Sequence, residues 1–184
     1  RQGYEYFKVL FGSTFKFDRE NLPDELESLA QKIMDEYDGN KEKKPRILIT
    51  GCPIGGATEK VIKAVEDNGG VVVSYENCSG EKNYDRLVKE DTKNPLKAIA
   101  ERYINIGCSV MSPNENRYEL LGRLIDKYKV DGVLDMELQS CHTYQIETTS
   151  IRKYVNEEKN IPYLALETDF SQADIGQINT RIAA

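Results

Sequence analysis

The sequence predicts an α/β domain of the Rossmann-like or flavodoxin-like kind, with about four parallel strands and helices on both faces of the sheet. Short, almost wholly apolar runs alternate with amphipathic helical segments along residues 45–184. This alternation is typical of parallel strands that are buried on both faces. A glycine-rich turn joins the first apolar run to its helix, and right-handed crossovers between parallel strands restrict the topology to these two fold types.

We predict that residues 1–44 form a helical N-terminal segment that links this domain to another part of a longer protein. The aromatic density of residues 1–22 is too high for a free tail, so we expect them to dock on this domain or on chain beyond it. Pro23 is typical of a helix start, and apolar side chains then repeat at helical spacing up to Gly39.

The remaining elements follow from short β-rich runs and from apolar repeats at helical spacing. Strands are expected at Arg46–Thr50, Val71–Glu76, Gly132–Leu138 and Ile161–Glu167. Helices are expected at Thr58–Asn68, Pro95–Tyr103, Arg117–Tyr128, about Tyr144–Lys159 and after Asp174. A long polar excursion, Asn77–Asn94, and an irregular segment, Ile104–Pro113, lie between them.

Composition excludes several classes of function. The formal net charge is −6 without a concentrated basic face, so nucleic acid is not the expected partner. No apolar run approaches the roughly 20 residues that span a bilayer, so we expect no membrane role. Four cysteines without a signal peptide indicate a reducing cytoplasm, where thiols are buried or bind metals rather than form disulfides.

Three of the four cysteines follow predicted strands. Cys52 comes after the first strand, Cys78 after the second and Cys141 after the third, whereas Cys108 lies in the irregular segment. The carboxyl ends of parallel strands meet at one edge of a sheet, so the fold can gather these thiols. The alternative is that each cysteine is a small buried hydrophobe.

The sequence around the thiols favours a metal site over packing. Cys78, Cys108 and Cys141 all lie in glycine- or hydroxyl-rich corners, and backbone amides and hydroxyls there can hydrogen-bond cluster sulfurs. The residues expected to contact a cofactor in this way are Ser79, Gly80 and Ser109. Two further residues are candidates for catalysis: His142, which can donate to a sulfide or relay a proton, and Glu147, which is expected to face the site.

Cys52 lies in TGCPIGGATEK, a glycine-rich turn between a strand and a helix. Such a turn can hold a phosphate at a helix N-terminus, but it matches neither common nucleotide-binding motif. A tight structural turn is the favoured interpretation. The role of Cys52 stays open between turn residue and ligand.

Taken together, TGCPIGGATEKV, ENCSGEK, GCSVMSPNENR, CHTYQIE and LALETDFSQADIGQINTR resemble the C-terminal half of the 2-hydroxyacyl-CoA dehydratase / benzoyl-CoA reductase family (D-component type). The similarity covers essentially the whole chain and is strongest to the double-cubane cluster protein branch. It implies two Rossmann-like domains, of which this chain supplies the second. It also implies a cysteine-bound [4Fe–4S] cluster or a bridged double cubane, with one ligand at Cys141.

The resemblance further implies that Cys78 and Cys108 are the extra ligands of the double-cubane branch. The implied chemistry is low-potential electron transfer: an ATP-hydrolysing iron–sulfur activator protein delivers an electron, and the acceptor cluster reduces an acyl-CoA or another small molecule. A homodimer or a homologous subunit is the expected assembly. Two alternatives remain, namely a dehydratase subunit with a single [4Fe–4S] cluster and a non-catalytic Rossmann-like phosphate-binding module.

Overall fold

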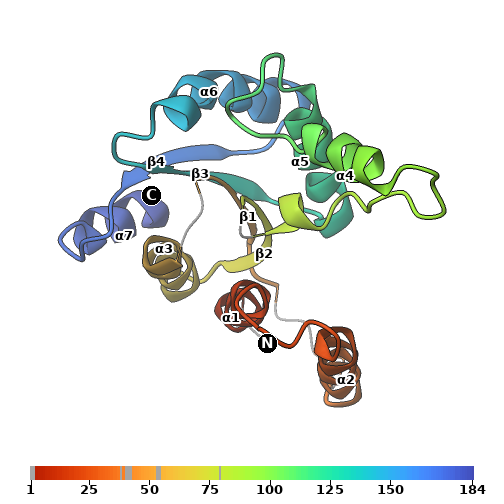
Figure 1. The fold of residues 1–184 in the computed structure, drawn as a ribbon. Helices are drawn as coiled ribbons and strands as arrows, with labels where there is room; N and C mark the ends of the chain where they lie inside the picture. The colour runs from red at the N-terminus through yellow and green to blue at the C-terminus, as the bar shows by residue number, and fades with distance from the viewer. Residues whose placement is uncertain (1–2, 38, 40–42, 53–54, 79) are drawn as a thin grey trace.

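The computed structural model describes residues 3–37, 39, 43–52, 55–78 and 80–184. In this part of the chain a parallel sheet has the order β2-β1-β3-β4 (Figure 1). Its strands are β1 (Arg46–Gly51), β2 (Val71–Glu76), β3 (Gly132–Leu138) and β4 (Tyr163–Thr168). The structure therefore confirms the predicted α/β fold class.

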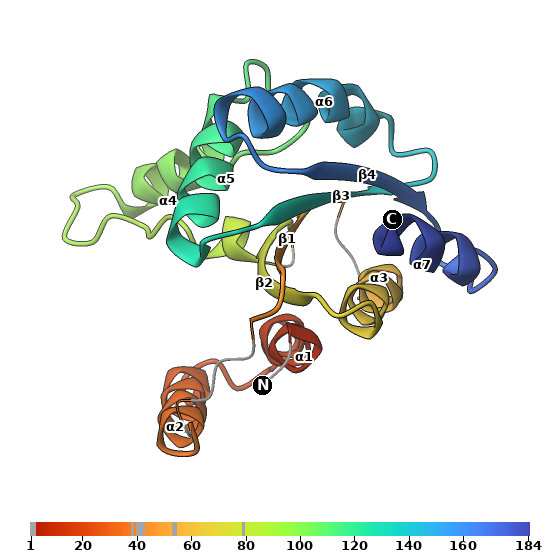
Figure 2. The ribbon, with the colours of Figure 1, turned by 180° about the vertical axis from the view of Figure 1, so that it is seen from behind.

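Helices cover both faces of the sheet, as Figures 1 and 2 show from opposite sides. One face carries α1 (Gly3–Ser13), α3 (Gly55–Asp67) and α7 (Ile175–Ala183). The other carries α5 (Glu115–Tyr128) and α6 (His142–Lys153). Successive strand residues point to opposite faces, so Ile49 packs with the first group and Leu48 with the second. The sheet thus separates two apolar cores.

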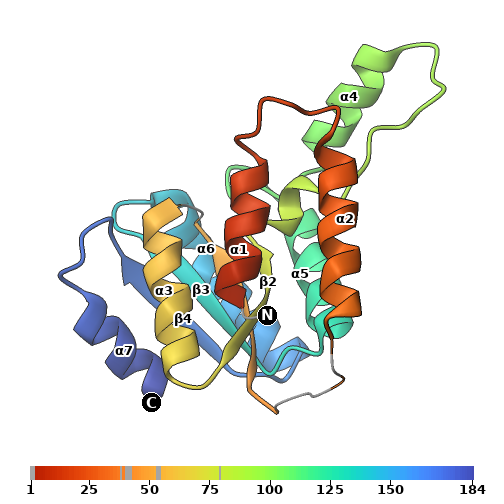
Figure 3. The ribbon, with the colours of Figure 1, turned by 90° about the horizontal axis from the view of Figure 1, so that it is seen from below.

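The aromatic N-terminal segment docks on this domain. Phe7 of α1 is buried, and its ring centroid lies 5.6 Å from that of Tyr75 in β2. The hydroxyl of Tyr75 donates a hydrogen bond of 2.8 Å to the carbonyl of Gly3. By contrast, α2 (Leu22–Asp35) buries none of its residues and runs beside α1 in Figure 3.

Several boundaries differ from the expected ones. The helix α2 ends at Asp35, four residues before Gly39. The helix expected over Tyr144–Lys159 begins two residues earlier, at His142, and its last part, Tyr154–Glu158, is π-helical. The strand β4 begins at Tyr163 rather than Ile161, because the preceding proline has no amide hydrogen to donate to a neighbouring strand.

The polar region between β2 and β3 holds a short 3-10 helix, η1 (Glu81–Asn83), and α4 (Pro95–Ile104), which projects from the domain in Figure 3. Asn94 caps α4 by accepting a hydrogen bond from the amide of Lys97. Across the described ranges, every helix is too short or too polar to cross a bilayer.

Candidate metal centre

The strand order creates a topological switch point between the carboxyl ends of β1 and β3. From β1 the chain passes outward to β2, and β3 then returns to the other side of β1. Ligands in open α/β sheets bind at such a switch point. Cys52 follows β1 and Cys141 follows β3, so these two thiols flank the switch point.

Cys52 and Cys141 interact directly. Cys52 is buried, and its amide donates a 2.7 Å hydrogen bond to the carbonyl of Met136 in β3. The pKa of Cys52 is raised to about 12, first because the thiol is buried and then because it donates a hydrogen bond to Cys141. The sequence predicted that the two thiols share an edge of the sheet, and the structure places them near each other there.

Cys141 is half-buried at the N-cap of α6. Burial raises the pKa of its thiol, but hydrogen bonds from Cys52, the Tyr144 amide and Thr143 outweigh that effect, and the pKa is lowered. The hydroxyl of Thr143 lies 3.8 Å from the sulfur. Because metals bind the thiolate rather than the thiol, this environment suits a metal ligand.

Cys78 is exposed just beyond the end of β2. Its sulfur lies 3.7 Å from the hydroxyl of Tyr144, which belongs to α6, and it also interacts electrostatically with Cys52. The structure thus brings Cys52, Cys78 and Cys141 to the same edge of the sheet, as the positions of the strands predicted.

Cys108 lies apart from this group in the contacts that the structure describes. It is half-buried in the loop between α4 and α5, and its carbonyl accepts a 2.8 Å hydrogen bond from the amide of Met111. The preceding Gly107 packs against the backbone of Arg117, where a Cβ would approach the amide nitrogen to 2.7 Å. Among the described residues, no three His, Cys, Asp or Glu side chains come together as a metal site.

The other predicted site residues have different surroundings. His142 is exposed at the first position of α6. Gly80 is buried against Tyr75, and a Cβ at this position would lie 2.2 Å from the Tyr75 carbonyl oxygen. Close packing therefore explains why a glycine stands here. Ser109 is half-buried beside Cys108, and Ser79 lies outside the described residues.

Glu147 belongs to a buried charged network that the sequence analysis did not predict. Its carboxylate accepts hydrogen bonds from Arg117 and from the Asn114 amide. The Arg117 side chain, which is 1% exposed, also reaches Glu76 at 3.4 Å and the hydroxyl of Thr50 at 3.0 Å. The network therefore joins residues from α5, α6 and the ends of β1 and β2.

The network contains three carboxylates and two cations. Lys82 of η1 forms a buried ion pair of 3.1 Å with Glu76, and Arg117 lies 4.0 Å from Asp135 of β3. Burial raises the pKa of Asp135 to about 6, although Arg117 and the hydroxyl of Tyr163 both act to lower it. Burial opposes the charge on Arg117, yet its pKa is raised because Glu76, Asp135 and Glu147 surround it.

One sequence signal pointed to part of this network. Arg117 precedes Leu120, Leu121 and Leu124 at helical spacing, which places it on the buried face of α5. Lys82 lies in a polar stretch where no periodicity distinguishes a buried lysine from an exposed one.

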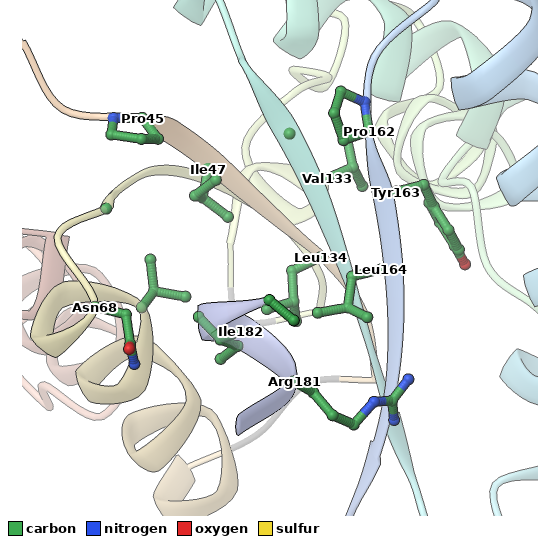
Figure 4. Close-up of a pocket in the computed structure, with 14 residues that line it drawn as sticks. Pro45, Ile47, Asn68, Val133, Leu134, Pro162, Tyr163, Leu164, Arg181 and Ile182 are labelled. Atoms are coloured by element: carbon green, nitrogen blue, oxygen red, sulfur yellow. The ribbon is translucent and has the colours of Figure 1, made fainter. Parts of the chain in front are cut away.

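A separate apolar cavity of about 340 Å³ lies at the opposite, amino ends of the strands. Figure 4 shows Ile47, Leu134, Leu164 and Ile182 lining it, with few polar side chains. It shares no lining residue with the thiol edge, so it is not part of the candidate metal centre.

The fold and the gathered thiols define a Rossmann-like α/β protein with a sulfur-rich edge at its switch point. The family model for 2-hydroxyglutaryl-CoA dehydratase, D-component, matches residues 2–184. The chain belongs to this family. Its membership confirms the resemblance seen in the sequence motifs.

Three relatives illustrate the range of the family. The chain is 47% identical over 184 residues to YjiM of Escherichia coli (strain K12), a protein assigned as a dehydratase subunit, covering 99% of this chain and 48% of YjiM. It is 28% identical to one of the subunits of the Thauera aromatica benzoyl-CoA reductase, covering 73% of this chain and 32% of that relative. Identity to the (R)-phenyllactyl-CoA dehydratase beta subunit of Clostridium sporogenes is 26%, covering 84% of this chain and 41% of that relative. The chain thus spans less than half the length of each relative.

Proposed function

We propose that this chain is the cluster-binding part of an ATP-dependent, low-potential reductase of the dehydratase family, of the double-cubane type. The observation that carries the proposal is the gathering of Cys52, Cys78 and Cys141 at the switch point of the sheet. Two relatives are named for reactions of CoA thioesters, which supports an acyl-CoA or another small molecule as substrate.

The donor set fits an iron–sulfur cluster. Thiolates are the soft ligands that these clusters use, and the Cys141 environment favours the thiolate. Cys78 is exposed and Cys141 is half-buried, so both sulfurs are open to a ligand. When bound, the cluster would accept and pass on single electrons at low potential. In this proposal Cys78, Cys108 and Cys141 are ligands, and the remaining ligands come from elsewhere in the polypeptide.

The proposal gives the neighbouring residues distinct roles. His142, exposed at the start of α6, would exchange a proton with substrate at the switch point. Glu147 would act from the same helix, held in place by Arg117 and Asn114. The expected partners are an ATP-hydrolysing iron–sulfur activator protein and a second copy or homologous subunit, and the expected location is the cytoplasm.

The position of Cys108 favours a second candidate function, a dehydratase subunit that binds a single [4Fe–4S] cluster through Cys141. No described contact of Cys108 joins it to the other thiols, whereas Cys141 interacts with Cys52. In the glycine-rich turn, packing explains Gly51, which has a φ of +94° and where a Cβ would lie 2.3 Å from the Met136 carbonyl oxygen. Gly55 and Gly56 at the start of α3 have open space around them, so the phosphate-binding alternative stays a prediction.

Iron and sulfide content of the whole polypeptide, reconstituted under anaerobic conditions, tests the proposal. We expect iron to fall in Cys78→Ser, Cys108→Ser and Cys141→Ser, each compared with the wild type. A loss in Cys141→Ser alone would establish the single-cluster candidate instead. Wild-type protein without iron or visible charge-transfer absorption after reconstitution would refute both.

A further inference from the structure

The hydroxyl of Tyr144 lies between a buried lysine and an exposed thiol. Its oxygen is 3.0 Å from the Lys82 ammonium nitrogen and 3.7 Å from the Cys78 sulfur. The tyrosine itself is 5% exposed. The three residues come from α6, from η1 and from the segment after β2, so the fold brings them together from separate parts of the chain.

Two hydrogen bonds meet at the Tyr144 hydroxyl. An ammonium group can only donate, so the Tyr144 oxygen accepts from Lys82. A phenol carries a single hydrogen, and Cys78 is the other described partner of this hydroxyl. A cluster ligand binds as the thiolate, which carries no hydrogen, so the Tyr144 hydroxyl donates its hydrogen to Cys78 when that cysteine is a ligand.

The surroundings hold the tyrosine in this position. Lys82 is anchored by Glu76 at 3.1 Å, and both side chains are nearly inaccessible to solvent. The Tyr144 ring also lies against two cations, with Lys82 5.3 Å and Arg117 4.9 Å from its centroid. The donor is thus already aimed at Cys78 before any ligand binds.

We propose that Tyr144 is a positioning residue whose hydrogen bond to Cys78 raises the reduction potential of the cluster that this sulfur ligates, with Lys82 aiming the hydroxyl. This inference rests on the proposed function, because it requires Cys78 to be a ligand. Reduction adds one electron to the cluster, and negative charge on its sulfurs increases. A hydrogen-bond donor stabilises that reduced state, and hydrogen bonds to sulfur are among the factors that set cluster potentials. No bond breaks, and the hydrogen stays on Tyr144.

The test is a redox titration of the iron-loaded, anaerobic whole polypeptide, followed by electron paramagnetic resonance. Tyr144→Phe removes the donor and keeps the ring. We expect about a tenfold loss in the equilibrium preference for the reduced state, which for a one-electron couple lowers the potential by about 59 mV. Lys82→Met, which frees the hydroxyl to turn, is expected to shift the potential in the same direction.

Tyr128→Phe is the matched control. The Tyr128 hydroxyl donates to Glu81, the neighbour of Lys82 in η1, at 2.6 Å, and it makes no described contact with Cys78. Its removal is expected to leave the potential unchanged.

Equal potentials in wild type and Tyr144→Phe at equal iron content would overturn the inference while leaving the proposed function intact. Loss of both iron and thermal stability in Tyr144→Phe would also overturn it, because Tyr144 would then be a packing residue. A wild type without iron would instead refute the proposed function.

Discussion

Arg117 and Glu147 form an ion pair that joins α5 to α6 beneath the candidate metal centre. The Arg117 side chain is 1% exposed, and it also approaches Glu76 and Asp135, which are equally inaccessible. One guanidinium therefore lies close to carboxylates from three different elements. Arg117 shares the charge balance of this edge with Lys82, which pairs with Glu76 at 3.1 Å.

Arg117→Met should destabilise the protein strongly. The substitution leaves Glu76 and Asp135 buried without this cation, and breaking a buried ion pair in this way costs about 3–5 kcal/mol. Equilibrium unfolding in urea measures the loss. Arg123→Met on the same helix is the matched control, because Arg123 is half exposed and pairs with Asp85 at the surface. Its effect should stay within about 1 kcal/mol. Similar losses in both variants would contradict a central role for Arg117.

Asp135 should give the stability a distinct pH dependence. Its pKa is raised from 3.8 to about 6 by burial, so the folded state binds this proton more tightly than the unfolded state. The stability that Asp135 provides relative to Asn is therefore fully present below pH 3.8 and lost as the pH rises through about 6. Unfolding free energies of wild type and Asp135→Asn, compared at several pH values, measure this difference. A difference that stays constant over that range would show that Asp135 keeps an ordinary pKa.

Gly51→Ala should be costly, although it adds only one methyl group. Gly51 ends β1 with a φ of +94°, and a Cβ there would lie 2.4 Å from a carboxylate oxygen of Asp135. We expect a loss on the order of 2–4 kcal/mol in thermal or chemical unfolding. Gly56→Ala is the control, since it lies in α3 with open space around it and should stabilise by up to about 1 kcal/mol. Equal effects at the two positions would be inconsistent with this packing.

Lys60→Met should loosen α7 from α3. The Lys60 ammonium, whose side chain is 4% exposed, donates to the carbonyl of Ser171 at 2.7 Å and pairs with Asp174 before α7. Its loss leaves a partly buried carboxylate unpaired, at a cost of about 1–3 kcal/mol. Hydrogen exchange should rise first in α7. The control is Lys63→Met on the same helix, where the side chain is mostly exposed, and α7 protection should be unaffected. Unchanged exchange in Lys60→Met would refute this link.

The fold was predictable because apolar periodicity reports burial directly. The strand ranges Val71–Glu76 and Gly132–Leu138 match the structure at both ends. The boundaries that differ depend on local chemistry that periodicity does not report, such as the π-helical turn after Lys153. The helix over Gly3–Ser13 was visible only as aromatic density, because its burial against β2 is a tertiary contact.

The candidate site was predictable in part. The sequence placed Cys52 and Cys141 at strand ends, but their contact follows from β1 lying beside β3, and strand order is not encoded in local patterns. The burial of Lys82 had no sequence signal, since a lysine in a polar stretch is ordinarily solvated. Whether Cys108 acts as a ligand stays a prediction.

The strand order also bears on how the protein assembles. Two local units, β1–α3–β2 and β3–α6–β4, come together where β1 pairs with β3, and the hydrogen bond from the Arg46 amide to Asp131 at the start of this pairing spans 85 residues. Closing so long a loop is slow compared with forming either unit. Cys52 and Cys78 belong to the first unit and Cys141 to the second, so the thiols meet only when the units dock. In the proposed cluster-binding role, metal loading would therefore be a late event in maturation that locks the two units together.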